Sequence, residues 1–303
     1  MQIERATGMG IRFQEAPFYR RSAARFGHAS GQRPSLRTAN FMTLSLMLFA
    51  LLASCDSPLL SEDMEGQPGE SSAESIQSSE AKPPVVLELF TSQGCSSCPP
   101  ADGLLSELHQ ERIIAGREVI ALSHHVDYWN RLGWKDPYSS PQASERQQYY
   151  VRSLEARGSY TPQIVVDGRY ETVGHREAEI RRLIEKDYPS YASIQLEIVQ
   201  GKRNPGIRIS LSRTLRKNEK IHIFLAQDNV QNPVPVGENA GRQLHHDGVV
   251  LLRRDLEGSQ RIFEVDSSIL PATEGEYRLV AFIQSPEGIH GAGQVAVDFP
   301  KIR

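Results

Sequence analysis

The 303-residue sequence predicts an α/β domain over residues 85–190, followed by an all-β, sandwich-like domain over residues 191–303. Three observations predict this organisation. Apolar runs of strand length alternate with helical periodicity as far as Pro189. From Ile194 onward, apolar residues recur at every second position, as they do in half-buried strands. A stretch rich in Ser, Pro and acidic residues, 56–84, precedes the first apolar run.

The charge of the chain is divided by segment. Residues 1–55 carry a net charge of +5, residues 56–84 carry -6, and residues 85–303 carry only -2, within a total of -3. Nucleic-acid binding requires a concentrated basic face that neutralises phosphates. The near-neutral charge of residues 85–303 therefore argues against a nucleic-acid partner.

The amino-terminal segment, residues 1–55, has the pattern of an export signal. An Arg-rich stretch precedes residues 41–54, an uncharged run that is shorter than the about 20 residues needed to span a bilayer. The run ends in Leu52-Ala53-Ser54-Cys55, which resembles a bacterial lipobox. That resemblance implies cleavage before Cys55 and a lipid on its thiol. Plain signal cleavage and an organelle transit peptide are the alternatives.

Residues 56–84 contain seven acidic residues, seven serines and few large apolar residues. Such a stretch buries too little surface to offset its ordering entropy, so we expect a disordered acidic tether. Together with the segment before it, the tether predicts a protein of the cell envelope, anchored by lipid on the periplasmic side of a bacterial membrane.

The α/β domain begins with a short buried strand at residues 85–90. A helix follows over residues 99–114, where Pro99 and Pro100 fit only the first turn because its N–H groups have no partner inside the helix. Residues 118–123 form a second strand.

A second helix begins after Ser140, a residue type that caps helices, and extends to about Leu154. Residues 163–166 and 170–173 are strands joined by Asp167-Gly168, a strong hairpin signal. A last helix surrounds residues 180–184. The resulting order, strand, helix, strand, helix, strand, strand, helix, is the order of the thioredoxin fold.

The all-β domain shows seven short segments with alternating hydrophobicity, separated by turns, and this pattern predicts an antiparallel sandwich. The segments are residues 194–198, 207–211, 221–225, 249–252, 261–265, 277–283 and 294–299.

Cys95-Ser96-Ser97-Cys98 lies between the first strand and the first helix. Unpaired N–H groups and the helix dipole at this position stabilise a thiolate, which favours Cys95 as a nucleophile. Cys98, one turn later, then resolves the mixed disulfide. A structural disulfide and a metal site are the alternatives. A bridge that closes so short a loop stabilises the fold by only about 2 kcal/mol, which favours the redox interpretation.

Strand directions bring further residues to the same edge of the sheet. If the first two strands are parallel and the third is antiparallel to them, residues 95–98, 124–129, 161–162 and 174–175 converge. The thioredoxin-like order also implies that Thr161-Pro162 is a cis peptide that faces the cysteines and presents backbone to an extended substrate.

Further candidate support residues lie in two regions, directly after the second strand and in the long connection before the segment 249–252. His124 or His125 is a candidate proton shuttle or thiolate partner, with an ordinary polar strand end as the alternative. Candidate support residues also include Asp127 as a relay carboxylate and Trp129 as an apolar wall; packing roles are the alternative for both. The long connection between residues 227 and 247 is expected to bring Arg242 and His245 to the edge that carries the cysteines.

Four segments, residues 90–102, 123–129, 161–168 and 237–244, resemble a bacterial secreted, thioredoxin-like family catalogued as domain of unknown function (DUF) 1223. The resemblance covers roughly residues 84–299. It implies an α/β thioredoxin-like domain followed by an all-β sandwich-like domain, and no established activity. Compared with thioredoxin itself, Ser96-Ser97 replaces Gly-Pro.

The functional expectation is a lipid-anchored thiol–disulfide oxidoreductase that uses Cys95 and Cys98, with no cofactor and no resident metal. Its expected partners are thiols or disulfides of envelope proteins, a redox partner, and the membrane through Cys55. Two other classes stay open at this point. One is a Cu(I) metallochaperone that binds through both cysteines and a histidine, and the other is a non-catalytic envelope binding module.

Overall fold

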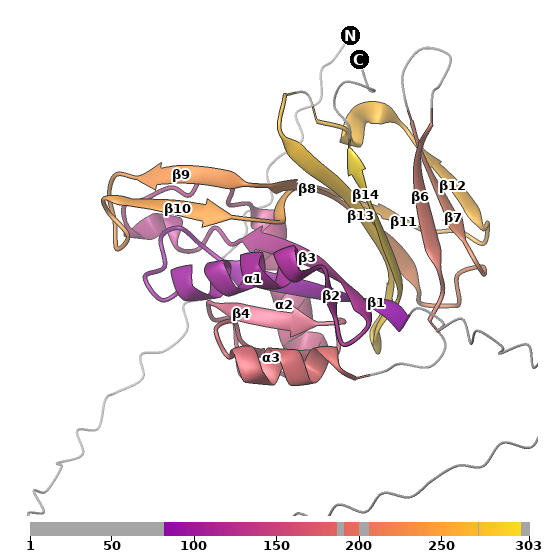
Figure 1. Cartoon of the computed structure of the whole chain (residues 1–303), viewed down its shortest axis with the longest axis horizontal. Coiled ribbons are helices and arrows are strands. Elements are labelled where there is room, and N and C mark those ends of the chain that lie inside the picture. The colour runs from indigo at the N-terminus through magenta and orange to yellow at the C-terminus, as the bar shows by residue number, and fades with distance from the viewer. Residues whose placement is uncertain (1–81, 187–190, 200–205, 272, 298–303) are drawn as a thin grey trace, which may run out of the picture. The chain divides into compact units, whose positions relative to one another are not determined.

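A nine-stranded mixed β-sheet forms the centre of the computed structural model, which describes residues 82–186, 191–199, 206–271 and 273–297 (Figure 1). The sheet order is β14-β13-β8-β11-β3-β1-β4-β5, and the short β2 pairs with β3. The strands are β1 (Lys82–Thr91), β2 (Ile113–Ile114), β3 (Arg117–His125), β4 (Gln163–Val166), β5 (Tyr170–Val173), β8 (Lys220–Asp228), β11 (Val249–Leu256), β13 (Glu276–Ser285) and β14 (Gly288–Val297). Residues 1–81, with Cys55 and most of the expected tether, lie outside the described residues.

The predicted fold class, an α/β thioredoxin-like domain followed by a separate all-β sandwich-like domain, is wrong. The described residues contain three α-helices and are mostly β, and strands from both predicted domains hydrogen-bond in one sheet. β11 pairs in parallel with β3 through Val249 and Ser123 and connects the two groups of strands. The physical reason is that β3 has a free hydrogen-bonding edge, and a strand more than a hundred residues later satisfies it.

Local predictions of strand direction are confirmed. β1 and β3 are parallel, with Phe90 opposite His124, and β4 is antiparallel to β1. β4 and β5 form the hairpin that Asp167-Gly168 predicts. The ends of β1 and β3 and the start of β4 therefore meet at one edge of the sheet.

Helices cover both faces of this part of the sheet. α1 (Pro99–Glu111) and α3 (Glu177–Ile184) pack on one face, in a core that includes Leu87, Leu105 and Ile180. α2 (Pro141–Ser153) packs on the opposite face, where its Tyr150 lies in one core with Phe90 of β1. The Ser140 hydroxyl accepts a hydrogen bond from the Ala143 N–H at 3.1 Å and caps α2, as expected.

All seven predicted alternating segments are strands, but they divide between two sheets. β6 (Ile194–Val199), β7 (Gly206–Leu211) and β12 (Ile262–Val265) form a second sheet, in the order β12-β7-β6. This second sheet packs on the β8-β13-β14 end of the large sheet through one apolar core. The other four segments are β8, β11, β13 and β14 of the large sheet.

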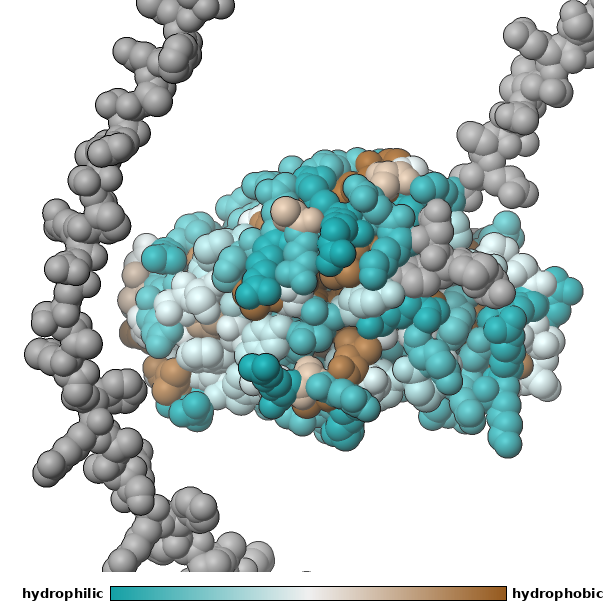
Figure 2. Space-filling model, turned by 90° about the horizontal axis from the view of Figure 1, so that it is seen from below, coloured by the Kyte–Doolittle hydropathy of each residue, from teal (hydrophilic) through white to brown (hydrophobic). Residues whose placement is uncertain are grey.

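A two-stranded hairpin, β9 (Val230–Val234) and β10 (Arg242–His246), occupies the long connection before β11. It lies beside the amino-terminal part of α1 (Figure 1). Figure 2 shows a face of the molecule on which apolar side chains form small, separate patches among polar ones. No helix in the described part of the chain is long and apolar enough to cross a membrane.

Candidate functional site

Cys95 and Cys98 form a disulfide at the start of α1, with their Cα atoms 5.5 Å apart. Cys95 lies in the turn after β1, and Cys98 occupies the N-cap position of α1, directly before Pro99. Both cysteines are fully buried, whereas Ser96 and Ser97 between them are exposed. A thiol from another molecule therefore has to approach across Ser96 and Ser97, or displace the residues that cover the two sulfur atoms.

The loop before β4 contacts the disulfide directly. The Thr161-Pro162 peptide is cis, as expected. The Thr161 hydroxyl donates a hydrogen bond to Cys95 Sγ at 3.3 Å, and the indole N–H of Trp129 donates to the same hydroxyl oxygen at 2.8 Å. The Ser97 hydroxyl lies 3.4 Å from Cys95 Sγ. Hydroxyl groups on two sides of Cys95 Sγ favour negative charge on this sulfur.

The turn between β9 and β10 also reaches the disulfide. The Asn239 amide donates hydrogen bonds to the carbonyl oxygens of Gln93 and Cys95, both at 2.9 Å. The Glu238 carboxylate accepts a hydrogen bond from the Ser96 N–H at 3.0 Å, and hydrogen bonds from the Ser96 side chain and backbone lower the Glu238 pKa. The turn thus holds the backbone on both sides of Cys95.

His124 lies on the sheet face that α2 covers. Its Nε2 atom is 2.9 Å from the Glu88 carboxylate, which also binds Arg146 and the Tyr150 hydroxyl. Burial would raise the pKa of Glu88, but the charge and hydrogen bonds of Arg146, with His124, hold it well below its usual value. Burial lowers the pKa of His124. This buried network occupies the face opposite to α1.

His125 points to the other face, toward α1. Its Nδ1 atom lies 2.7 Å from the Asp136 carboxylate, and its ring meets the His246 ring edge-on at 4.7 Å. Burial by itself lowers the pKa of His125, but the charge and hydrogen bond of Asp136, with the charge of Asp102, outweigh it and raise the pKa. Burial by itself raises the pKa of Asp136, but the charge and hydrogen bond of His125 outweigh it and lower the pKa.

The remaining predicted support residues form no hydrogen bond with the disulfide in the part of the chain that the structure describes. Asp127 exchanges hydrogen bonds with Ser144 and ties the loop after β3 to α2. Arg242 is exposed at the start of β10, and its side chain forms no hydrogen bond or ion pair with the residues that the structure describes. His245 is exposed and lies 4.0 Å from the Asp247 carboxylate. The 227–247 connection thus contacts the cysteine turn through Glu238 and Asn239.

Sequence reasoning missed several residues that surround the site, namely Glu88, Gln93, Asp136, Asn239 and His246. Gln93 has four partners: its N–H donates to Asp136 Oδ2 at 2.8 Å, and its side chain hydrogen-bonds with Trp134, Asn232 and His246. One sequence signal was available for His246: it follows the apolar Leu244 by two residues, and residues two apart in a strand share a face. The structure buries both positions in β10, but one apolar residue in a short polar segment is a weak signal.

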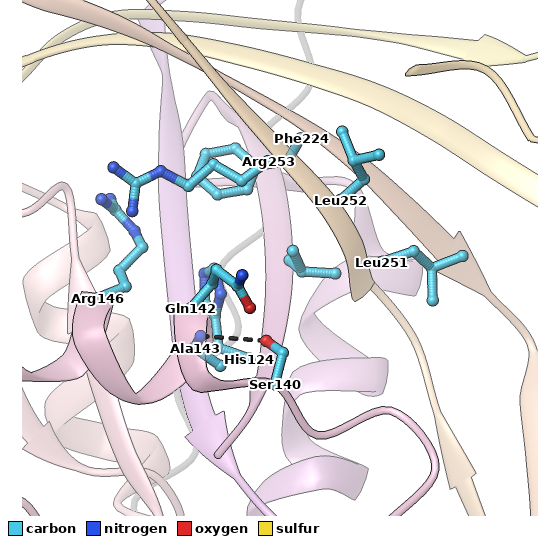
Figure 3. A pocket seen from close by; sticks show the side chains of 10 residues that line it. His124, Ser140, Gln142, Ala143, Arg146, Phe224, Leu251, Leu252 and Arg253 are labelled. Carbon is cyan, nitrogen blue, oxygen red and sulfur yellow. Dashed lines mark hydrogen bonds between the residues drawn. The ribbon is translucent and has the colours of Figure 1, made fainter. Parts of the chain in front are cut away.

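A pocket of about 210 Å³ lies on the α2 side of the sheet, between α2 and strands β8 and β11. The guanidinium groups of Arg146 and Arg253 face the same end of it, and Leu251 and Leu252 line the other end (Figure 3). Each guanidinium already binds a carboxylate, Arg146 that of Glu88 and Arg253 that of Asp255. Because these charges are compensated and the disulfide lies elsewhere, we assign the chemistry to the cysteines and not to this pocket.

No group of three or more His, Cys, Asp or Glu side chains among the described residues is arranged to hold a metal ion. The two histidines that a copper site would recruit are each bound to a carboxylate, His124 to Glu88 and His125 to Asp136.

Several solved structures resemble the chain, and two of them show the range of similarity. The crystal structure of a protein from Agrobacterium tumefaciens is 27% identical, has a TM-score of 0.56, and the match covers 72% of this chain and 96% of that one. The structure of HBP35 of Porphyromonas gingivalis is 16% identical, with a TM-score of 0.52 and coverage of 72% and 76%. The second likeness concerns the fold alone. None of the curated proteins matches the chain.

The family comparison covers the same region as the site. A family model described as "protein of unknown function (DUF1223)" matches residues 86–284, which include the disulfide, the Thr161-Pro162 loop and the β9–β10 turn. The chain therefore belongs to the DUF1223 family of proteins of unknown function.

Proposed function

We propose that the chain is a thiol–disulfide oxidoreductase whose reacting groups are Cys95 and Cys98. The observation that carries the proposal is the Thr161 hydroxyl on Cys95 Sγ, supplied from 66 residues further along the chain. A bridge with a purely structural role requires no donor on one of its sulfurs. A four-residue loop closed by a disulfide also stabilises a fold by only about 2 kcal/mol.

The two cysteines have different roles in this proposal. In the dithiol form, the Cys95 thiolate attacks a substrate disulfide, forms a mixed disulfide and releases one substrate thiolate, which takes up a proton. Cys98 then loses its proton and attacks Cys95 Sγ, so that the Cys95–Cys98 bond forms and the second substrate thiol leaves. Two electrons pass from the protein to the substrate, and the reverse sequence oxidises a substrate dithiol.

The surroundings of the disulfide support a polypeptide as the substrate. Among the described residues, two exposed large apolar side chains lie on segments that contact the cysteine turn: Leu132, at 42% exposure, follows Trp129, which lies beside Gly94, and Val236, at 48%, precedes Glu238, which binds Ser96. The half-buried Trp134 donates to the Gln93 side chain at 3.2 Å, next to that turn. Apolar and aromatic groups of this kind bind side chains of an extended peptide.

We further propose that the protein acts in the bacterial cell envelope, anchored by lipid at Cys55. The support is the uncharged run that ends in Leu52-Ala53-Ser54-Cys55. Mass spectrometry of protein purified from membranes should detect a lipidated Cys55 as the first residue. An unmodified Cys55 thiol would contradict this localisation.

The test of the chemistry is a pair of single-cysteine variants of the full chain. Cys98→Ala should accumulate mixed disulfides with polypeptides, because nothing resolves the bond that Cys95 forms, and Cys95→Ala should accumulate none. Non-reducing electrophoresis measures both. Equal trapping by the two variants, or trapping by neither, counts against the assignment. The reduction potential of the wild-type couple, measured in glutathione buffers, then assigns the direction of electron flow.

A further inference from the structure

A seam of buried polar side chains, which ends at the half-buried His109, runs along one face of α1, between that helix and strands β1, β3 and β10. Asp102, Ser106 and His109 contribute to it from α1, where spacings of four and three residues place them on one face. The other members come from the sheet and from the end of the hairpin: Thr91, Ser123, His125, His246 and Asp247. We call these eight residues the α1 seam.

Nine buried nitrogen and oxygen atoms of the α1 seam have no hydrogen-bond partner among the described residues. They are Thr91 Oγ1, both Asp102 carboxylate oxygens, Ser106 Oγ, His109 Nδ1, Ser123 Oγ, His125 Nε2, His246 Nδ1 and Asp247 Oδ2. Buried polar atoms in proteins are paired with other protein atoms or with ordered water. Nine such atoms lie beside one helix, so ordered water would have to supply their hydrogen-bond partners.

One end of the seam lies beside the disulfide. Asp102 follows Cys98 by one helical turn, and the Asp102 N–H donates to the Cys98 carbonyl oxygen at 3.1 Å. Both side chains are buried, and positions i and i+4 of a helix share a face. When the disulfide opens, Cys98 becomes a buried thiolate, whose charge is costly until a proton reaches it.

The tautomer of His246 directs a proton toward Asp102. Trp134 and Asn232 both donate to Gln93 Oε1, which fixes the amide so that its nitrogen faces His246 Nε2 at 3.4 Å. An amide nitrogen is a donor, so neutral His246 accepts at Nε2 and carries its proton on Nδ1. His246 Nδ1 lies 3.7 Å from Asp102 Oδ1. A small side-chain movement or one bridging water would complete the hydrogen bond between them.

The other end of the seam opens to solvent, about 16 Å from Cys98 along the helix. There His109 is 20% exposed, its Nε2 atom lies 3.6 Å from the Asp228 carboxylate, and it lines a cavity of about 410 Å³ together with Arg278. Burial and the charge of Arg278 lower the pKa of His109. A neutral imidazole in this position accepts a proton from one side and releases one to the other.

We propose that the α1 seam is the proton pathway of the Cys95–Cys98 couple, in which Asp102 exchanges protons with Cys98 and His109 exchanges them with solvent. The inference rests on the proposed function and adds the route of the protons to it. When an external thiolate attacks Cys95 Sγ, the S–S bond breaks and Cys98 leaves as a thiolate. One proton then moves from the seam to Cys98, and His109 takes up one from solvent.

Charged groups face both ends of this route. His125 from β3 and His246 from β10 face Asp102, and Asp136 binds His125 from behind. His109 is faced by Asp228 from β8, by Asp247 after β10 and by Arg278 from β13, with Arg112 on its own side. The pathway therefore separates proton exchange from the surface at Ser96 and Ser97, where a polypeptide substrate would bind.

The test uses reduction of the disulfide in the full chain by dithiothreitol, followed by fluorescence of Trp129 and Trp134 between about pH 5 and pH 9. Rates are normalised to the dithiothreitol thiolate. Asp102→Asn, which keeps the shape of the side chain, should slow reduction at neutral pH by at least about tenfold and flatten the pH profile. Glu107→Gln, on the exposed side of the same helix, is the control and should match the wild type.

His109→Ala provides the second arm. It should slow reduction, and added imidazole should restore the rate, because the cavity beside residue 109 has room for a free imidazole. A side chain with only a structural role would not be replaced in this way. Rates and pH profiles of Asp102→Asn equal to those of Glu107→Gln, or no imidazole rescue of His109→Ala, overturn the pathway. Dithiothreitol reduces the disulfide whatever the natural substrate is, so failure here differs from failure to trap polypeptides.

Discussion

Two adjacent histidines at the end of β3 have opposite properties. His124 faces α2, where burial lowers its pKa against the opposing effect of Glu88. His125 faces α1, and although burial alone would lower its pKa, Asp136 raises it. Alternation along a strand sends the two rings to opposite faces, so one residue of separation decides which carboxylate each ring meets.

Stability should therefore depend on pH in opposite ways at these two positions. The folded-state pKa of His125 is raised, so its contribution is complete below about 6.5, the unfolded value, and disappears as pH rises through the folded value. The folded-state pKa of His124 is lowered, so its contribution is present above about 6.5 and disappears as pH falls.

Urea denaturation of His125→Gln and His124→Gln against wild type, from about pH 5 to pH 9, measures this. His125→Gln should cost about 3–5 kcal/mol below about pH 6.5, because it leaves the Asp136 carboxylate buried without its charged partner, and less at higher pH. The cost of His124→Gln should instead decrease as pH falls. Parallel curves for the two variants would show that these charge states are wrong.

The β9–β10 hairpin is the element whose position matters most for access to the disulfide. Its turn binds the backbone at Gln93, Cys95 and Ser96 through Asn239 and Glu238, while both cysteines are buried. The sequence places a long polar connection here but does not show that it is a hairpin, because β10 contains a single apolar residue, Leu244, and the other buried position is the polar His246.

Asn239→Ala should speed the reaction of the disulfide with small thiols. It removes two hydrogen bonds, each worth about 1 kcal/mol, and their sum corresponds to an increase of about thirtyfold in the population with the turn displaced. Stopped-flow reduction by glutathione measures the rate. Gln231→Ala, on the exposed side of β9, is the matched control and should react like the wild type. An unchanged or lower rate for Asn239→Ala would mean that the turn does not restrict access.

At the scale of the whole molecule, one sheet crosses the boundary that the sequence suggests between two domains. Gly248 lies at the connection: its carbonyl oxygen accepts from the Ser123 N–H at 2.7 Å, and its own N–H donates to Asp228 at 2.8 Å. Arg278 from β13 binds Asp228 and also the Ala121 carbonyl oxygen at 3.1 Å. Backbone and buried charge together join the β3 and β8 sides of the sheet.

Gly248→Ala should therefore destabilise both parts of the sheet at once. The backbone at residue 248 has φ +69°, and an added Cβ would lie 2.5 Å from the Ala121 carbonyl oxygen. We expect a loss of at least about 2 kcal/mol and a single cooperative transition in wild type and variant alike. Calorimetry combined with circular dichroism checks both points. Two separate transitions, with only one affected, would favour two independent domains. Gly241→Ala, at φ +81° with no atom near the added Cβ, separates backbone strain from the collision.

The sequence by itself determined the local elements of this protein and the edge at which its cysteines lie. Period-two runs, two prolines after Cys98 and the Asp167-Gly168 turn predict strands, a helix start and a hairpin that the structure confirms. Those signals act between near neighbours, and strand direction then brings Cys95 to Thr161. Tertiary structure alone decided that β11 joins β3, that Asn239 holds the cysteine turn, and that Asp102 meets His246. The physical reason is that each of these pairings joins strand edges or buried polar atoms that lie more than a hundred residues apart in the sequence. A local sequence pattern does not specify which distant group satisfies a given edge or polar atom.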